Sequence, residues 1–274
     1  MIAARLGGGM FTVMIVVVLV ASVLTGLAAG RWRRRRLAAG DERIGVKDLV
    51  TPGLTLTTLV LAFMLVQASA SFDAARDDAA AEADAVQNLY QTAGYAPPPQ
   101  RQAIQAAMVC YGRAVQGHEW IIDDGSQSSE PSHWAGRAQT QFATLAESGH
   151  AAFRPLVSAD QARANERRGR VGESVVKTPL GVYIAVLVAL AVTLIGYGVL
   201  LPGGGRAVHL AALSAVTGVF ALMLLLIYDM ELPFTGMITV EPTAIETASR
   251  QLGEQYAASY PGARLPCDQT GRPS

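Results

Sequence analysis

Residues 10–36 read MFTVMIVVVLVASVLTGLAAGRWRRRR and contain the junction that decides the fold. About 20 apolar residues in an α-helix reach about 30 Å, which is the thickness of the hydrocarbon core of a bilayer. Basic side chains stay on the cytoplasmic side of a membrane, so the arginines after the apolar run also predict its direction. These arginines are Arg31, Arg33, Arg34, Arg35 and Arg36. We therefore expect a transmembrane helix over residues 10–30 that ends in the cytoplasm.

A cleaved signal peptide is the alternative for this apolar run. A signal peptide carries its positive charge before the apolar region. Here only Arg5 precedes the run, and five arginines follow it. The pattern favours a retained helix whose N-terminus lies outside the cytoplasm. The arginines are then also placed to contact anionic lipid headgroups, at about 1 kcal/mol per residue.

Three further windows of the 274-residue chain match the first. The composition is 51% apolar with no formal net charge, and Asp, Glu, Lys and Arg are absent from each window. The four windows are residues 10–30, 52–71, 180–201 and 207–228. Each is long enough to cross a bilayer, so the sequence predicts an all-α integral membrane protein with four transmembrane helices. The lack of charge at membrane depth argues against an ion-coupled transporter.

Charge bias assigns the remaining segments to the two sides of the membrane. The loop 31–50 has seven basic and three acidic residues, whereas residues 72–179 have ten basic and thirteen acidic. The tail 229–274 has three basic and six acidic residues. We therefore expect an N-terminal membrane hairpin (1–71), a helical extracytoplasmic domain (72–179), a C-terminal hairpin (180–228) and an extracytoplasmic tail. This places a multi-pass protein in the bacterial plasma membrane with both termini outside.

The outer domain shows helical periodicity. Residues 72–92 are expected to continue span 2 into water, and Pro97–Pro99 to end that helix. Further helices are expected up to Trp120, from about 132 to 145, and after a cap at Ser158 and Asp160. In the tail, only residues 237–240 read as a short strand.

The two cysteines, Cys110 and Cys267, both fall outside in this topology. Disulfides persist in such an oxidising compartment, so we expect a bridge between the tail and the outer domain. The chain-entropy model gives such a long loop about 5 kcal/mol. The alternative is that Cys110 is a buried, free thiol on a helix.

Several residues are spaced as in a known bacterial family. They are Glu82, Leu89, Arg101, Tyr111, His118, Glu119 and Trp120, followed after span 4 by Leu232–Gly236, Val240 and Pro242. Together they resemble the four-span membrane proteins called bestrophin-like, over roughly residues 50–250. The resemblance implies kinship with anion channels. The hydrophilic region of bestrophins is cytosolic, whereas charge bias places this one outside.

No pattern indicates an enzyme, a bound cofactor or a nucleic-acid partner. No serine or cysteine pairs recognisably with a histidine as an activated nucleophile would. The histidines at 118, 133, 150 and 209 match no compact zinc-ligand spacing, so we expect no metal site. We interpret Glu119 and Trp120 as structural, through ion pairs with the nearby arginines and a packed ring.

Span 2 is the most polar of the four. Thr51, Thr55 and Thr58 share one helical face, which can either pack against another helix or line a pore. Small residues in span 1, Gly26 and Gly30, and around Gly218 in span 4 favour helix packing. We expect a structural or interaction protein that assembles with itself or partners through its spans and outer domain. The alternative is an oligomeric, bestrophin-like ion channel.

Overall fold

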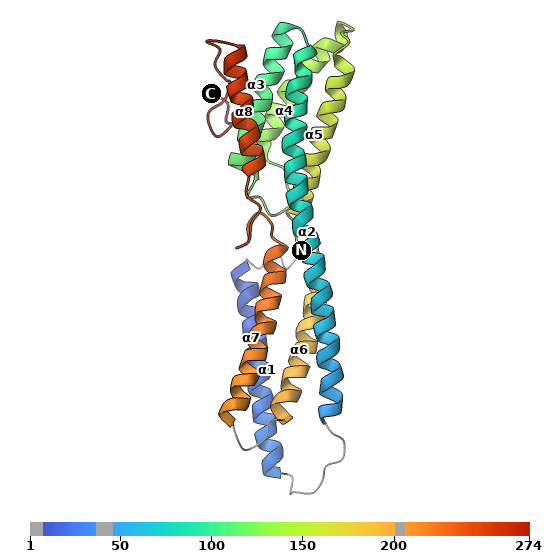
Figure 1. Ribbon diagram of the computed structural model, residues 1–274, viewed down its shortest axis with the longest axis vertical. Coiled ribbons are helices and arrows are strands. Elements are labelled where there is room, and N and C mark those ends of the chain that lie inside the picture. The colour runs from blue at the N-terminus through green and yellow to red at the C-terminus, as the bar shows by residue number, and fades with distance from the viewer. Residues whose placement is uncertain (1–7, 37–45, 201–205) are drawn as a thin grey trace. The chain divides into compact units, whose positions relative to one another are not determined.

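The computed structural model describes residues 8–36, 46–200 and 206–274 (Figure 1). Within these ranges every regular element is a helix, and the only β-pairing is an isolated bridge between Cys267 and Pro273. The chain divides into two compact units. The membrane unit combines the chain up to Ala70 with Val176–Glu231, and the helical unit combines Ser71–Val175 with Leu232–Ser274.

The membrane unit contains α1 (Gly8–Arg36), the first half of α2 (Val46–Thr92), α6 (Leu180–Leu200) and α7 (Arg206–Met230). Four helices among the described residues are long and apolar enough to cross a bilayer, which confirms the predicted number. The candidate spans are Met10–Trp32, Thr51–Tyr95, Leu180–Leu200 and Ala207–Met230. The apolar part of the second candidate span is the first half of α2.

Helices α1 and α6 pack through glycines. A Cβ on Gly26 would lie 2.7 Å from the carbonyl oxygen of Ile195, and a Cβ on Gly198 would lie 2.7 Å from the carbonyl carbon of Gly26. A Cβ on Gly30 would meet the carbonyl oxygen of Gly198 at 2.9 Å. The predicted packing role of Gly26 and Gly30 is confirmed. Gly218 of α7, in contrast, has open space around its Cβ position.

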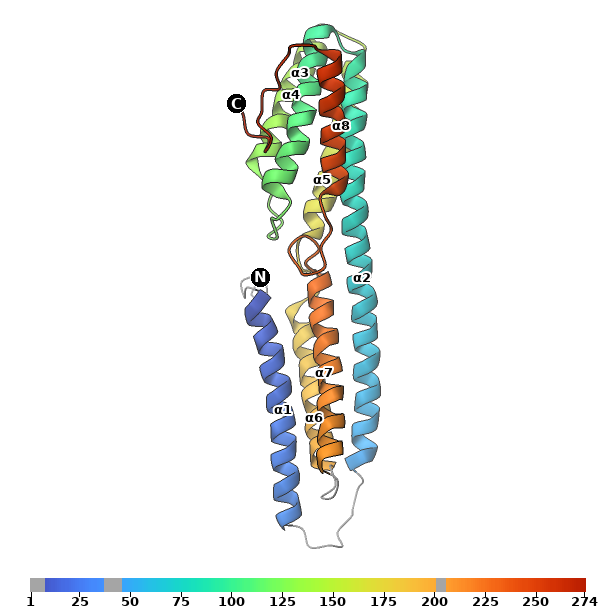
Figure 2. The same ribbon diagram turned by 60° about the vertical axis from the view of Figure 1, so that its left-hand side comes forward.

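The helical unit is built from the second half of α2, α3 (Pro98–Ala114), α4 (Ser129–Glu147), α5 (Phe153–Glu173) and α8 (Thr243–Ser259). The short turns η1 (Ala93–Tyr95) and η2 (Val115–Glu119, a π-helical turn) flank α3. Figures 1 and 2 show these helices side by side as a bundle, with α8 lying along α3. Apolar faces meet in one core that includes Leu89, Ile104, Trp134 and Leu156, each fully buried.

Three local expectations were wrong. Helix α5 begins at Phe153, so Ser158 and Asp160 lie inside it rather than at its cap. The run Met237–Val240 is an irregular loop. The tail contains the unpredicted helix α8, whose buried Ile245, Ala248 and Leu252 recur at helical spacing and fill the core of the unit.

Candidate functional site

Three of the residues that carry the family resemblance, Glu82, Tyr111 and Glu119, converge on one buried cluster in the helical unit. We call this cluster the ionic core and define it as Glu82, Tyr111, Glu119, Asp160, Arg163, Arg167 and Arg170, each at most 8% exposed. Its arginines are spaced four and three residues apart along α5 and so share one helical face. Arg168 lies off that face and is exposed.

Arg170 joins two carboxylates from different parts of the chain. Its Nε donates to Glu82 of α2, and its Nη2 donates to Oε1 of Glu119 at 2.5 Å. The hydroxyl of Tyr111 donates to the other oxygen of Glu82 at 2.5 Å. One guanidinium therefore connects α2, α5 and the end of η2 in the interior of the bundle.

Arg167 forms a two-pronged ion pair with Glu119. Its Nε donates to Oε1 at 3.0 Å, and its Nη2 donates to Oε2. The guanidinium also donates to the hydroxyl of Ser132 and to the carbonyl of Ser128, both at 3.0 Å. The amide of Ser128 donates to Glu119 at 2.7 Å, so this carboxylate is fully enclosed by donors.

Aromatic rings extend the ionic core. The guanidinium of Arg163 stacks 4.7 Å from the ring centre of Tyr111 and pairs with Asp160 at 2.7 Å. The ring of Trp120 lies 5.3 Å from Arg170 and packs edge-on against Phe234, with centroids 5.2 Å apart. Cation–π and edge-to-face contacts of this kind favour a single arrangement of the charges. The interpretation of Glu119 and Trp120 as ion-paired and ring-packed is confirmed.

The surroundings of the ionic core favour the ionised carboxylate of Glu119 and the neutral hydroxyl of Tyr111. Burial raises the pKa of Glu119, but the Arg167 hydrogen bond and the charges of Arg170 and Arg167 outweigh it, so the pKa is lowered. Burial and the charge of Glu82 raise the pKa of Tyr111 well above its usual value. Three arginines face three carboxylates, so the cluster is charge-balanced. Such a network specifies one packing of helices and offers no exposed nucleophile or base.

The π-helical turn η2 explains why Glu119 and Trp120 point inward. A π-turn adds one residue to a helical turn and so shifts the facing of the residues that follow. The two side chains end buried, at 1% and 5% exposure. Sequence periodicity could not reveal this shift, because α3 by itself has an ordinary helical pattern.

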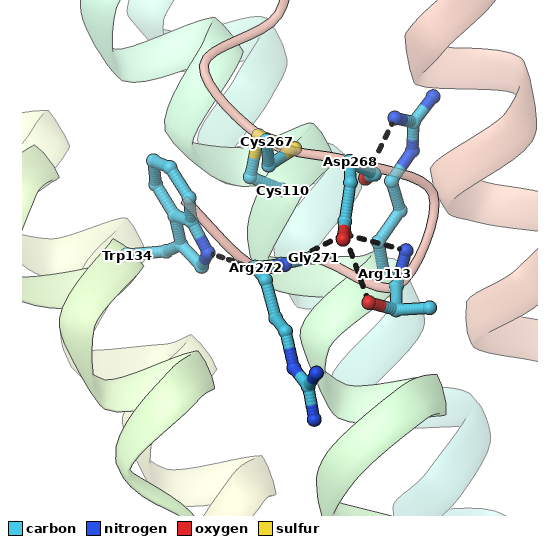
Figure 3. Close-up of a disulfide and its surroundings, with 8 residues drawn as sticks. Cys110, Arg113, Trp134, Cys267, Asp268, Gly271 and Arg272 are labelled. Carbon is cyan, nitrogen blue, oxygen red and sulfur yellow. Dashed lines mark hydrogen bonds between the residues drawn. A yellow bond between two sulfur atoms is a disulfide. The ribbon is translucent and has the colours of Figure 1, made fainter. Parts of the chain in front are cut away.

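A second site ties the C-terminal tail to α3 and α4 (Figure 3). Cys110 and Cys267 form a disulfide with a Cα–Cα distance of 5.8 Å, so the predicted bridge is present. The indole Nε1 of Trp134 donates to the carbonyl of Gly271 at 2.6 Å, and Arg113 donates to the carbonyl of Asp268 at 3.1 Å. Gly271 has φ +81° and abuts Ala114, so only glycine fits this position.

The carboxylate of Asp268 organises the turn of this tail. It accepts hydrogen bonds from the amides of Thr270 and Arg272 and from the hydroxyl of Thr270. These bonds lower the pKa of Asp268, with the amide of Arg272 as the largest contribution. The end of the tail therefore has a defined conformation. We call residues 267–272, with their disulfide and hydrogen bonds to α3 and α4, the latch.

The predicted threonine face of span 2 is not covered by its own chain. Thr51, Thr55 and Thr58 are all exposed, whereas Thr57 is buried at 3%. The hydroxyls of Thr55 and Thr58 donate to the carbonyls four residues earlier, at 3.1 and 2.9 Å. The face of α2 that packs within the chain is the opposite one, formed by Thr57, Leu61, Met64 and Ala68.

The other predicted positions are spread over the chain. Arg31 and Arg35 are exposed, and the side chains of Arg33, Arg34 and Arg36 lie outside the described part of the structure. Among the described residues no three metal-ligating side chains come together. At the end of α7, Glu231 is buried, which raises the pKa of its carboxyl, and it accepts a hydrogen bond from Thr178.

Comparison with known proteins defines the family. A profile of the bestrophin-like domain matches residues 12–245, which is most of the chain. The chain belongs to the bestrophin-like family. The match ends before the second cysteine, so half of the disulfide lies beyond it.

Solved structures share the fold. A bacterial bestrophin homologue from Klebsiella pneumoniae superposes with a TM-score of 0.67 at 15% identity, covering 89% of this chain and 98% of that chain. A point variant of that homologue gives a TM-score of 0.66 at 15% identity, with 88% and 98% covered. A crystal structure described only as a membrane protein gives 0.65 at 16% identity, with 89% and 98% covered. No curated protein matches this chain significantly.

Proposed function

We propose that this bestrophin-like protein self-assembles in the membrane through the uncovered face of α2. The observation that carries the proposal is the division of that helix into two faces. Residues 57, 61, 64 and 68 are packed by the chain itself, whereas Leu56, Leu59, Phe63 and Val66 are each more than half exposed. The exposed arc also carries the polar side chains of Thr51, Thr55, Thr58 and Gln67.

Lipid by itself is a poor cover for this arc. A glutamine amide in a span needs hydrogen-bond partners that hydrocarbon cannot supply. The short threonines allow close approach of another helix, and small side chains are enriched where transmembrane helices associate. A second copy of the chain can supply both hydrogen-bond partners for the glutamine and a helix that packs closely against the threonines. The bilayer and a further copy are therefore the proposed partners.

The second candidate is a channel formed by the same assembly. It is favoured by the composition of the exposed arc, where Thr55 and Thr58 are interspersed with the bulky apolar Leu56 and Leu59. Hydroxyls can face water, and apolar constrictions can gate a pore without charged groups. Two of the similar structures are of a bacterial bestrophin homologue, and a channel role would agree with the kinship that the resemblance implies. Neither candidate requires an enzyme activity.

The experiment that tests assembly compares two threonine variants in mild detergent. Thr55→Leu should weaken the oligomer, because the larger side chain holds neighbouring helices apart. Thr217→Leu on α7 is the matched control, since its hydroxyl also bonds its own helix, at 2.8 Å. An oligomer of Thr55→Leu as strong as the unmodified one would contradict the α2 surface. If the surface lines a pore, Thr55→Ala should instead change conductance in reconstituted bilayers and leave assembly intact.

We also propose that the helical unit and both termini are extracytoplasmic. The support is the arginine block after span 1 together with a disulfide, which persists in oxidising compartments. A membrane-impermeant thiol reagent applied to whole cells should label Gln127→Cys, an exposed loop position, and should not label Gly40→Cys. The reverse labelling would overturn this orientation.

A further inference from the structure

The loop between α7 and α8 displays two apolar side chains at its tip. Met237 is 87% exposed and Ile238 is 45% exposed. The amide of Val240 donates to the carbonyl of Pro233 at 2.7 Å, which closes the neck of the loop. Figure 2 shows the segment as a ring-like loop. The tip is therefore held out by a closed backbone rather than by a slack connection.

Trp120 fixes the neck to the rest of the helical unit. The Nε1 of Trp120 donates to the carbonyl of Val240 at 3.0 Å, and its ring packs on Phe234. Phe234 and Val240 are buried, while the residues between them are mostly exposed. Packing thus divides the apolar residues of this loop into two that attach it and two that it presents outward.

Two more exposed apolar residues flank the loop that follows Trp120. Ile121 directly follows Trp120 and is 75% exposed. Val175 is 37% exposed and lies against the loop after Trp120, since a Cβ on Gly125 would be 2.7 Å from its Cγ2. We call Ile121, Val175, Met237 and Ile238 the apolar rim.

Chain connectivity keeps the apolar rim close to the bilayer. Pro233 follows the last residue of the fourth candidate span by three positions, and Val175 precedes the first residue of the third by five. An extended chain covers at most about 3.6 Å per residue, so the neck lies within about 11 Å of one span end and Val175 within about 18 Å of the other. The polar region of a bilayer adds about 5–8 Å on each side of the hydrocarbon core. Pro233 and Val175 are therefore tied close to the headgroup region, and we infer the same for the rim side chains that adjoin them.

We propose that the apolar rim inserts into the headgroup–acyl boundary of the surrounding lipid. Exposed aliphatic side chains at this depth exchange water for hydrocarbon, which is favourable in proportion to the area buried. The exposed charges nearest in sequence are the basic Lys177 and the acidic Asp123, Asp124 and Glu241, so acidic groups outnumber basic ones there and the proposed contact is apolar. The inference holds for either orientation of the chain and does not depend on self-assembly.

The test uses the full chain in phosphatidylcholine vesicles with a fluorescent, environment-sensitive thiol label on Met237→Cys. The two native cysteines are joined to each other, so the label is specific. Tyr95→Cys is the matched control, because Tyr95 is 77% exposed but lies in η1, directly after the far end of α2. Helix α2 rises about 1.5 Å per residue, which places its end about 33 Å beyond Ala70.

The label on Met237→Cys should shift its emission to the blue and lose fluorescence to lipids spin-labelled near the headgroup. The label on Tyr95→Cys should respond only to aqueous iodide. A Met237→Cys label quenched by iodide and unaffected by the lipid quencher would overturn the proposal. Protection from both quenchers would also overturn it, because protein rather than lipid would then cover the rim. Quenching that rises steeply with added anionic lipid would contradict an apolar contact.

Discussion

In the membrane unit, Gly26 of α1 lies directly against Gly198 of α6, whereas in the helical unit Arg167 and Arg170 of α5 reach carboxylates from other segments. The first contact has no side chain at all. The second uses some of the longest and most polar side chains in the chain. Both are buried, and both connect helices that are far apart in the sequence.

The two kinds of contact differ because lipid surrounds the spans of the membrane unit, whereas water surrounds the helical unit. Lipid gives apolar helices no reason to associate, so spans gain from close backbone approach. Water drives apolar faces together, but this attraction has no preferred direction. Many different helix arrangements would therefore bury the same apolar surface. Buried ion pairs add little net stability, yet they penalise any arrangement that leaves one charge unpaired. We infer that the ionic core selects the packing of the helical unit rather than supplying its stability.

The largest expected effect is the loss of one partner from the ionic core. Arg170→Met should destabilise the helical unit by about 3–5 kcal/mol, because Glu82 and Glu119 would each lose a buried counter-charge. Thermal unfolding followed by circular dichroism measures the change. Arg168→Met, two residues away and exposed, is the control and should change stability by no more than about 0.5 kcal/mol. Equal effects of the two variants would contradict the role of the cluster.

The second-largest effect on stability is expected from removal of the disulfide that holds the tail. The disulfide closes a loop across a sequence separation of 157 residues. Replacement of both cysteines by serine should cost about 2–5 kcal/mol, since the unfolded chain regains its freedom. Limited proteolysis should then cut the tail near Asp268 before the rest of the helical unit. A tail that stays protected would show that the hydrogen bonds of Trp134 and Arg113 suffice without the bridge.

A smaller effect is expected in the membrane unit. Gly198→Val should separate α1 from α6 and cost about 1–3 kcal/mol, the usual range for overpacking. Gly218→Ala, where the added Cβ meets nothing within 4 Å, should be neutral or slightly stabilising. The detergent concentration or temperature at which the spans dissociate or unfold distinguishes the two. If both variants behave alike, close approach is not what holds α1 to α6.

The smallest effect concerns pH. The pKa of Glu119 is lowered from its ordinary value of 4.5, so its stabilising contribution is complete above that value. The contribution should be lost as the pH falls through the lower pKa of the folded state, because the unfolded chain then binds the proton more tightly. Thermal midpoints from about pH 7 to about pH 3 should therefore fall less steeply for Glu119→Gln than for the unmodified chain. Parallel curves would contradict this linkage.

The sequence was sufficient for the features that depend on composition. Apolar length predicted four spans, the absence of a helix breaker after span 2 predicted the continuation of α2, and the spacing of small residues predicted the glycine contacts of α1. The bridge between Cys110 and Cys267 followed from a topology argument, although 157 residues separate them. These features are read from single segments or from their order along the chain.

Features that depend on three-dimensional convergence were not predictable in the same way. Glu82 and Glu119 belong to the residues that carry the family resemblance, but no local pattern shows that they meet at Arg170. The π-turn at Val115–Glu119 changes which side chains point inward, and periodicity within α3 does not record it. Helix α8 was not predicted although Ile245, Ala248 and Leu252 have helical spacing, because the β-branched residues just before it indicate a strand.

The central claim is that copies of the chain meet through the uncovered face of α2. The most direct measurement is oxidative cross-linking of Thr58→Cys in native membranes, where the native cysteines are already paired. Val219→Cys on α7, 57% exposed, is the control. We predict that Thr58→Cys forms disulfide-linked dimers readily and that Val219→Cys does not. Efficient cross-linking at Val219 with none at Thr58 would contradict the account.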